Sequence, residues 1–370
     1  MNTATAHRPV AAATIAAFPQ PPRSRADYQL IGGAGERAAA AKLVNAEWYK
    51  CPVPRQLMKQ LMQRDDVHAI RDTALWYALI LGSGALFVYG WTSGWSTWSL
   101  FAAYFVYATL YCSPADSRWH EASHGTAFKT RWINDLLYQC ASFQVLRRPT
   151  KWRWSHARHH TDTLVTGRDP EIAAPLPIDI VGTMFNVFAI QNGPKELLAV
   201  LRNATGSISA DEKTFVPEME WPKMVREARV WLLVYALIIG TAALLHNCMP
   251  VLLLGLLPGM LGAWLYNYTG LTQHAGLPEN VLDHRLNCRT VYMNPVLRFL
   301  YWNMNYHVEH HMFPMVPYHA LPRLHEAIKA DCPAPYASSL AAWAEILPAL
   351  LRQAKDTQHF VPRPVPAQAA

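Results

Sequence analysis

The sequence predicts an all-α integral membrane protein in which four transmembrane helices form two hairpins beneath a cytosolic, histidine-rich helical cap. The first observation behind this prediction is composition. Of the 370 residues, 51% are hydrophobic and only 16% are charged, whereas soluble domains average about 25% charged residues. The second observation is a set of apolar runs that come in two pairs, and the third is a set of histidine clusters that lie outside those runs.

The first pair of apolar runs occupies residues 74–112, with a short turn near residues 92–95. Each run approaches the roughly 20 residues that cross a hydrocarbon core. The turn is too short to hold a domain, so the two runs are expected to form a transmembrane hairpin. The polar and basic segment 46–73 before them is expected to be a helical segment on the membrane surface.

The second pair of runs occupies residues 230–269, with a turn at 246–250. Segment 113–229, between the hairpins, carries many lysines and arginines, whereas the hairpin turns carry none. The positive-inside rule therefore places this segment in the cytoplasm, together with segment 270–355 and both termini. We expect a multi-pass protein of the bacterial inner membrane with all three histidine clusters on the cytoplasmic side.

Two terminal segments, 1–45 and 356–370, are rich in alanine and proline and are expected to be disordered. The apolar run Val10–Phe18 is too short to span a bilayer, and a disordered tail is preferred there over a signal peptide. Six cysteines without a CxxC pair predict no disulfide framework. The net charge of +7 fits basic cytoplasmic loops, so no nucleic-acid partner is inferred.

The three histidine clusters are HEASH at 120–124, HARHH at 156–160 and HVEHH at 307–311. Residues i, i+3 and i+4 share one face of a helix, so each cluster is expected to present two or three imidazoles in one direction. Neutral imidazole binds iron, copper, nickel and zinc. Eight imidazoles are twice what one tetrahedral zinc ion needs, which predicts two neighbouring metal ions. The candidate ligands are His120, His124, His156, His159, His160, His307, His310 and His311.

An all-nitrogen site for two metals suits redox iron, although spacing alone does not name the metal because imidazole also suits zinc, copper and nickel. A pair of iron(II) ions can reduce dioxygen and generate an oxidant that takes hydrogen from an unactivated C–H bond, as soluble di-iron proteins do. A membrane setting offers a water-poor route for a long apolar substrate. Ordinary surface histidines would explain one such pair but explain three clusters poorly.

The three clusters resemble the three histidine boxes of the membrane-bound fatty acid desaturase family, which contains di-iron desaturases and hydroxylases. The resemblance covers about 118–173 and 266–325, with the paired-hairpin layout between them. Flanking residues agree as well, among them Asp169-Pro-Glu171 after the second box. The resemblance implies a further ligand after the fourth span, His274, so that nine histidines would hold two iron ions.

Similarity to this family implies an oxidase that uses O2 and two external electrons to desaturate a fatty acyl chain. Hydroxylase, acetylenase and ketolase reactions on a lipid-like substrate remain alternatives on the same site. The first box has HxxxH spacing, which makes coenzyme A thioesters less expected, and no His-Pro-Gly-Gly heme motif is present. A separate donor of the ferredoxin, rubredoxin or cytochrome b5 type would therefore supply the electrons.

Several polar residues near the boxes are candidates to support the ligands. Glu121, Asp169 and Glu309 are candidates to orient imidazoles by accepting their N–H bonds, and Glu171 resembles Asp169 in this respect. Asn267 is a candidate to hold a metal-bound water. Each has an alternative as an ordinary structural or solvated helix residue. The histidines outside the clusters are assigned no role, namely His246, His284, His319 and His325.

A membrane zinc protease is the main alternative from another class. The first cluster fits HExxH, in which two histidines bind zinc and Glu121 would act as the general base. That function would leave the second and third clusters unused. An electron carrier with histidine-ligated heme is a further alternative, but its axial histidines would be expected well apart on facing spans rather than in tight groups outside them.

Overall fold

The computed structural model describes residues 23–366. The regular secondary structure of this part of the chain is helical, and extended segments pair only in the isolated bridges Thr290–Tyr306 and Val291–Tyr336. The predicted all-α class is therefore confirmed for the described residues. The run Val10–Phe18 lies outside them.

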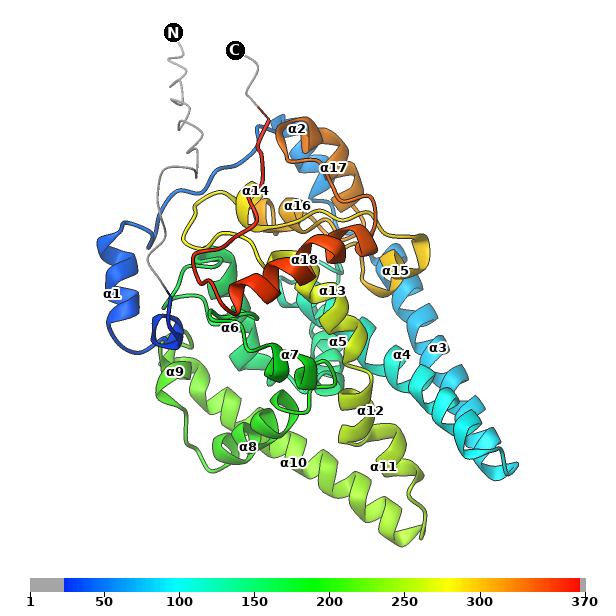
Figure 1. Cartoon of the computed structure of the whole chain (residues 1–370). Coiled ribbons are helices and arrows are strands. Elements are labelled where there is room, and N and C mark those ends of the chain that lie inside the picture. The colour runs from blue at the N-terminus through cyan, green and yellow to red at the C-terminus, as the bar shows by residue number, and fades with distance from the viewer. Residues whose placement is uncertain (1–22, 367–370) are drawn as a thin grey trace.

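Four helical segments project from the body of the molecule as two pairs (Figure 1). Helix α3 packs beside α4, and α10 packs beside α11. The segments are α3 (Asp66–Thr92), α4 (Thr97–Ser123), α10 (Trp221–Leu244) and the succession α11 (Met249–Leu254), α12 (Leu256–Leu261) and α13 (Trp264–His274).

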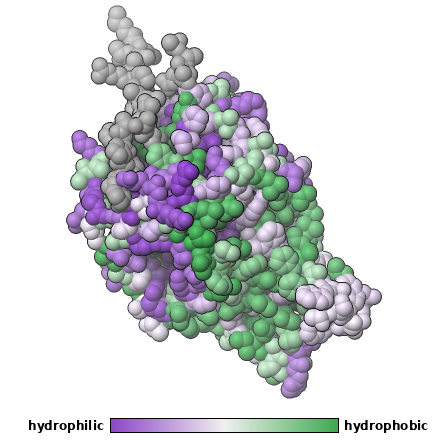
Figure 2. All heavy atoms as spheres, viewed as in Figure 1, coloured by the Kyte–Doolittle hydropathy of each residue, from purple (hydrophilic) through white to green (hydrophobic). Residues whose placement is uncertain are grey.

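Three stretches are long and apolar enough to cross a membrane: Arg55–Thr92, Glu218–Leu244 and Met249–His274. Large apolar side chains on them face outward, and Leu81 and Leu237 are 71% and 61% exposed. Figure 2 shows hydrophobic residues over the projecting helices, whereas hydrophilic residues gather over part of the body. An apolar exterior of this size suits lipid better than water.

The fourth predicted span lies in α4, which is not among these three stretches. Its hydropathy is lowered by hydroxyl-bearing residues such as Tyr104, Tyr107 and Thr109. Two of these hydroxyls are used inside the protein, because Tyr104 Oη donates to the Leu252 carbonyl at 2.7 Å and Tyr107 Oη to the carbonyl of Leu253 at 2.5 Å. These polar groups of α4 thus form hydrogen bonds with the second hairpin instead of facing outward.

Helix α4 continues past Pro114 and carries the first histidine cluster beyond the apolar stem. Proline has no N–H group, so the carbonyl four residues earlier loses its helical donor. That carbonyl, on Leu110, accepts a hydrogen bond from Trp76 Nε1 of α3 at 2.7 Å. The hairpin partner therefore satisfies the group that proline leaves free, and the helix extends to Ser123.

The returning segment of the second hairpin is broken at Gly255 and again between α12 and α13. At Gly262 an added Cβ would lie 1.9 Å from the carbonyl oxygen of Ala108 in α4. The Gly262 carbonyl also accepts a hydrogen bond from Ser113 Oγ of α4 at 2.6 Å. The break allows this close approach, and it replaces the single continuous span that the apolar run predicts.

The remaining helices form the body. Before the first hairpin are the 3-10 helix η2 (Arg25–Tyr28), α1 (Gly33–Ala40) and α2 (Arg55–Leu61). Between the hairpins are α5 (Arg131–Gln144), α6 (Pro149–Thr161), α7 (Ile180–Asn186), α8 (Asn192–Ala204), α9 (Ala210–Lys213) and the 3-10 helix η3 (Glu218–Glu220). After the second are α14 (His284–Asn287), α15 (Pro295–Leu300), α16 (His307–Met312), α17 (Leu321–Ile328), the 3-10 helix η4 (Lys329–Asp331) and α18 (Ser339–Gln353).

Two helix starts differ from those expected. Helix α3 begins at Asp66 instead of residue 74, because the Asp65 side chain caps its first turn by accepting from the Val67 N–H. Helix α10 begins at Trp221 instead of residue 230, and Pro222 occupies its first turn. Polar helical turns thus extend both apolar runs.

The described parts of the terminal segments are ordered, in contrast to the disorder expected for 1–45 and 356–370. Tyr28 Oη donates to Glu279 at 2.7 Å, and α1 follows it in the chain. At the other end, the Val361 N–H donates to the Gly276 carbonyl at 2.8 Å. Composition did not indicate this order because the partners lie far away in the sequence.

Candidate metal centre

All the predicted histidine ligands are brought together in two groups. The first cluster ends α4, the second lies in the latter half of α6, and the third belongs to α16. His274 ends α13. Two helices of the projecting hairpins and two helices of the body therefore meet at one place.

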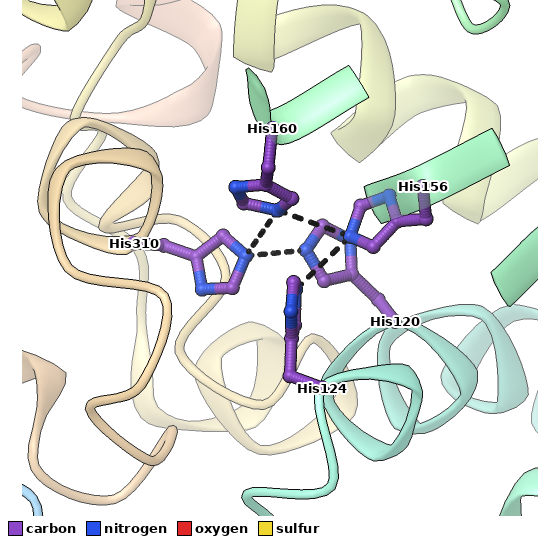
Figure 3. A group of neighbouring side chains, drawn as sticks. All are labelled: His120, His124, His156, His160 and His310. Carbon is purple, nitrogen blue, oxygen red and sulfur yellow. Dashed lines mark hydrogen bonds between the residues drawn. The ribbon is translucent and has the colours of Figure 1, made fainter. Parts of the chain in front are cut away.

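The five-histidine group comes from α4, α6 and α16, and its ligand atoms all lie within 4.8 Å of one another. Figure 3 shows the rings turned towards a common centre. His120 Nε2 lies 2.7 Å from His310 Nε2. His156 Nε2 lies 3.1 Å from the Nε2 atoms of both His124 and His160. The members are His120, His124, His156, His160 and His310.

The four-histidine group contains His159, His274, His307 and His311, whose ligand atoms also lie within 4.8 Å of one another. His307 Nε2 lies 2.9 Å from His274 Nε2. The two groups touch, because the ring of His311 stacks on that of His160 with centroids 4.2 Å apart. His274 joins this group as the resemblance implied.

Each HxxHH cluster is divided between the groups. The expectation that two or three imidazoles of a cluster share one direction is therefore met by two, the i, i+4 pair. In the second cluster the i, i+4 pair His156 and His160 belongs to the five-histidine group and His159 to the other. The third cluster does the reverse, with His310 in the five-histidine group. Consecutive residues lie about 100° apart around a helix, so adjacent histidines face different centres.

Two carboxylates orient ligands in the second cluster. His159 Nδ1 donates to Asp169 Oδ2 at 2.9 Å, and His156 Nδ1 donates to Glu171 Oε2 at 3.0 Å. Asp169 is itself fixed, because its Oδ2 also accepts from the Leu164 N–H at 2.8 Å. An imidazole that donates through Nδ1 presents a lone pair at Nε2, which is the arrangement that metal ligation needs.

Two further ligands are oriented by uncharged groups. His274 Nδ1 donates to the Asn287 carbonyl at 2.8 Å. His311 Nδ1 lies 3.1 Å from Thr163 Oγ1. The Nε2 atom of His311 is buried without a hydrogen-bond partner, as expected for an atom that is kept for a metal ion.

The donor set fits metal ions on physical grounds. Because His156 donates from Nδ1 to Glu171, its Nε2 carries a lone pair, yet two other Nε2 atoms lie 3.1 Å away. Facing lone pairs repel one another unless a cation lies between them. Nitrogens bound at right angles to one ion, each about 2.1 Å from it, lie about 3.0 Å apart. The spacing therefore fits imidazoles that share an ion.

Burial keeps most of these rings neutral. Burial, followed by the charges of neighbouring histidines, lowers the pKa values of His160 and His310 well below the usual range. His159 differs, because the Asp169 carboxylate outweighs the effect of burial and raises the pKa of this imidazole. Neutral imidazole is the metal-binding form, so burial favours ligation by the rings whose pKa it lowers. For His159, the Asp169 carboxylate orients the ligand.

Glu121 lies inside the first box but does not face the histidines. Its Oε1 accepts the Tyr318 N–H at 3.1 Å, and the side chain is fully buried. Burial raises the pKa of Glu121 to about 7. The prediction that it orients an imidazole is therefore not supported by its contacts, and the carboxylate joins the first box to the loop after the third.

Glu309 and Asn267 also have partners other than ligands. Glu309 Oε1 lies 2.5 Å from His325 Nδ1, and its Oε2 accepts from Thr290 Oγ1 at 2.6 Å. Asn267 Nδ2 donates to the Val187 carbonyl at 3.1 Å, which ties α13 to the end of α7. Both residues therefore support the packing around the centre, and His325, which was assigned no role, is part of that support.

His284 was also assigned no role, yet it lies beside the four-histidine group. Ligand atoms of His284, Cys288 and His311 lie within 4.8 Å of one another, and all three residues are buried. Burial lowers the pKa of His284 to about 3. The i, i+4 spacing of His284 and Cys288 was a signal in the sequence, but a single pair of this kind is weak.

The fold and the site define a membrane-embedded helical protein with nine histidines gathered in two contacting groups. The family model described as fatty acid desaturase matches residues 96–342, more than half of the 370-residue chain. The protein therefore belongs to the fatty acid desaturase family, and the resemblance of its histidine boxes is confirmed. The curated proteins contain no match. Family membership and the apolar helices together make it an integral membrane oxidoreductase that acts on lipids.

Proposed function

We propose that the protein is a membrane-bound non-heme di-iron oxidase that uses O2 and two external electrons to desaturate a fatty acyl chain. The observation that carries this proposal is the convergence of nine histidine nitrogens in two contacting groups. Imidazole ligands suit iron, and two adjacent groups suit two ions. The family supplies the lipid substrate class.

The five-histidine group would hold one iron ion and the four-histidine group the other. Iron bound there would supply the activation of O2 and the removal of hydrogen from a C–H bond. The residues of the chain hold and orient the ligands, with Asp169 and Glu171 each fixing one ring. Burial of rings such as His310, which is 0% exposed, keeps bulk water from the ligands.

The proposed topology has α3, α4, α10 and the α11–α13 succession crossing the membrane, with the body and both termini in the cytoplasm of a bacterium. The basic residues between the hairpins support this orientation. His124 caps α4 and His274 ends α13, so both hairpins deliver ligands to one place. A lipid chain held by the stem would be positioned there, and positioning would select the carbon that reacts.

An external one-electron carrier of the ferredoxin, rubredoxin or cytochrome b5 type would reduce the centre. Hydroxylation, acetylenic bond formation and ketone formation remain alternative outcomes on the same site, because all begin with removal of hydrogen from the same kind of C–H bond. The product distinguishes them.

The zinc protease alternative is not proposed. A general base of HExxH must reach the zinc-bound water, whereas Glu121 accepts the Tyr318 N–H. His120 and His124 are also gathered with three further histidines, which is more than a protease site uses.

Production of a changed lipid tests the proposal most simply. We would express the protein in a bacterial host together with each donor type in turn and analyse acyl chains by gas chromatography and mass spectrometry. The expected result is a new unsaturated acyl chain that disappears in His310→Ala and persists in His246→Ala, an exposed histidine outside both groups. A hydroxylated product would assign the alternative reaction. Unchanged lipids with every donor would contradict the proposal.

A further inference from the structure

An aromatic stack outside the two histidine groups links the protein surface to the four-histidine group. The rings of Trp48 and His284 lie within 8° of parallel, with centroids 4.2 Å apart. The ring of His284 lies 5.1 Å from that of His311. Trp48 is partly exposed, whereas His284 is buried. The stack therefore begins at the surface and ends against a candidate ligand.

Hydrogen bonds hold the Trp48 end of the stack in place. Trp48 Nε1 donates to the carbonyl of Thr161, the residue directly after the second box, at 3.1 Å. The next residue, Tyr49, donates its N–H to the Leu282 carbonyl at 3.0 Å. His284 is the first residue of α14. Hydrogen bonds to two separate parts of the body thus fix the indole ring over the imidazole.

Neither ring is needed by the groups already described. His284 is not a member of the five-histidine or the four-histidine group, and Trp48 precedes the family match, which begins at residue 96. A stacked indole and imidazole could be simple packing. Their position between the surface and a ligand ring indicates a second use.

That use follows from the proposed function, on which this inference rests. The reaction needs electrons from a separate protein, but ligands such as His307 and His310 are 1% and 0% exposed. Electron tunnelling weakens steeply with distance and is assisted by conjugated rings in close contact. A surface ring stacked on a buried ring beside a ligand would shorten the gap that an electron must cross.

A second aromatic chain reaches the histidines but is less close. Trp119 lies 5.4 Å from His156, and its ring meets Trp152 edge-on at 5.9 Å. The guanidinium of Arg147 lies over the Trp119 ring at 4.4 Å. The parallel contact between Trp48 and His284 is shorter than either ring-to-ring contact of this chain.

We propose that Trp48 is the point at which electrons enter the protein and that His284 conducts them to the His311 side of the four-histidine group. One electron at a time would leave a reduced iron–sulfur or cytochrome donor and arrive at an oxidised metal ion. The two rings mediate tunnelling, and no bond in them forms or breaks. Two such transfers supply one turnover.

A photochemical experiment tests this route without depending on the natural donor. A ruthenium photosensitiser is attached to the metal-loaded protein at Lys50→Cys in a Cys140→Ser/Cys248→Ser background, which removes the exposed native thiols. A flash with a sacrificial reductant injects one electron, and loss of the ferric absorption gives the reduction rate. Trp48→Leu is expected to slow this rate several-fold, and Trp48→Phe, which keeps a ring, is expected to slow it less.

A second label site separates the route from damage to the centre. Arg131 is exposed and lies on α5, so a photosensitiser at Arg131→Cys should reduce the metals at a rate that Trp48→Leu does not change. If the label at residue 50 reduces the metal at the same rate in the Trp48→Leu variant as in the protein that retains Trp48, the proposal is overturned. An equal slowing from both labels would also overturn it, because the substitution would then act on the centre itself. Absence of a reducible metal in the wild-type protein would instead refute the proposed function.

Discussion

The two histidine groups achieve similar gatherings of nitrogen atoms in different ways. Within residues 23–366, the five-histidine group has more ligands, but only His156 has a hydrogen-bond partner on Nδ1. In the four-histidine group, three of the four rings are held from behind, by Asp169, the Asn287 carbonyl and Thr163. The five-histidine group thus has more ligands, whereas the four-histidine group has more rings that are oriented by a hydrogen bond.

This difference teaches how adjacent histidines can serve two ions. His159 and His160 are neighbours in α6 but belong to different groups, and so do His310 and His311 in α16. A helix that turns about 100° per residue supplies ligands to both centres from one short motif. The loss of a ligand or of its partner should therefore affect one ion more than the other, which the following predictions exploit.

The largest difference is expected between His159→Ala and His160→Ala. The first leaves three histidines in the four-histidine group, and the second leaves four in the five-histidine group. His159→Ala should weaken binding of the ion at the four-histidine group more than about 100-fold, beyond the usual cost of losing an orienting partner. His160→Ala should weaken binding of the ion at the five-histidine group by a smaller factor. Metal retained against a chelator series measures both losses. Equal losses would contradict the expectation that the five-histidine group tolerates the loss of one ligand better.

A smaller effect is expected when an orienting carboxylate loses its charge. Asp169→Asn should weaken the ion at the four-histidine group about 10–100-fold, because His159 loses a charged partner that orients its ring. Glu171→Gln is the matched variant, and its effect should lie at the lower end of that range because His156 shares its ion with four other histidines. Titration of the metal-free protein gives both affinities. A larger effect of Glu171→Gln would reverse the comparison.

Much of the centre could be predicted from the sequence because spacing within a short helix is a local property. The three boxes are of this kind, whereas His274 was implied only by the family resemblance and Asp169 lies in the loop after the second box. The division of His159 from His160 was not predictable, because it depends on the angles at which α4, α6, α13 and α16 meet. His284 was missed for the same reason, since its partner Trp48 precedes the first hairpin.

The fold shows the same limit. Apolar length indicated the two hairpins but not the break at Gly262. That break accompanies the close approach of α4, whose Ala108 carbonyl oxygen leaves no room for a Cβ at residue 262. Alanine and proline content suggested disordered tails, whereas Tyr28 and Val361 have hydrogen-bond partners in the segment after α13. These features depend on contacts between segments that are distant in the sequence, so local sequence patterns did not predict them.

A pH dependence is expected in the metal-free protein. Burial lowers the pKa values of His160 and His310 in the folded state below their ordinary value of 6.5. Below that pH the unfolded chain binds protons that the folded protein excludes, so stability is lost as the pH falls. Each such ring contributes up to about 1.4 kcal/mol per pH unit, and His159, whose pKa is raised, opposes the trend. Thermal unfolding from about pH 8 to pH 5.5 checks the sign, and stabilisation on acidification would contradict it.

The smallest effect on metal is expected for Glu121→Gln. The amide can still accept the Tyr318 N–H, and the side chain contacts neither group, so metal content should not change. Burial raises the folded-state pKa of Glu121 to about 7, so the stability it contributes is lost as the pH rises through that value. The free energy of unfolding of the variant, taken relative to that of the wild type, should therefore rise by about 1 kcal/mol between pH 6 and pH 8. Loss of metal in this variant would contradict this prediction, because it would show that Glu121 helps to orient the histidine ligands.

Metal content tests the central claim, that the two groups hold two iron ions. Elemental analysis of the detergent-purified protein should find about two irons per chain, as in other di-iron proteins. His310→Ala/His311→Ala removes one ligand from each group and should abolish this iron, whereas the control His246→Ala should keep it. A single zinc ion that survives in the double variant would contradict the account, because neither group would then hold the metal.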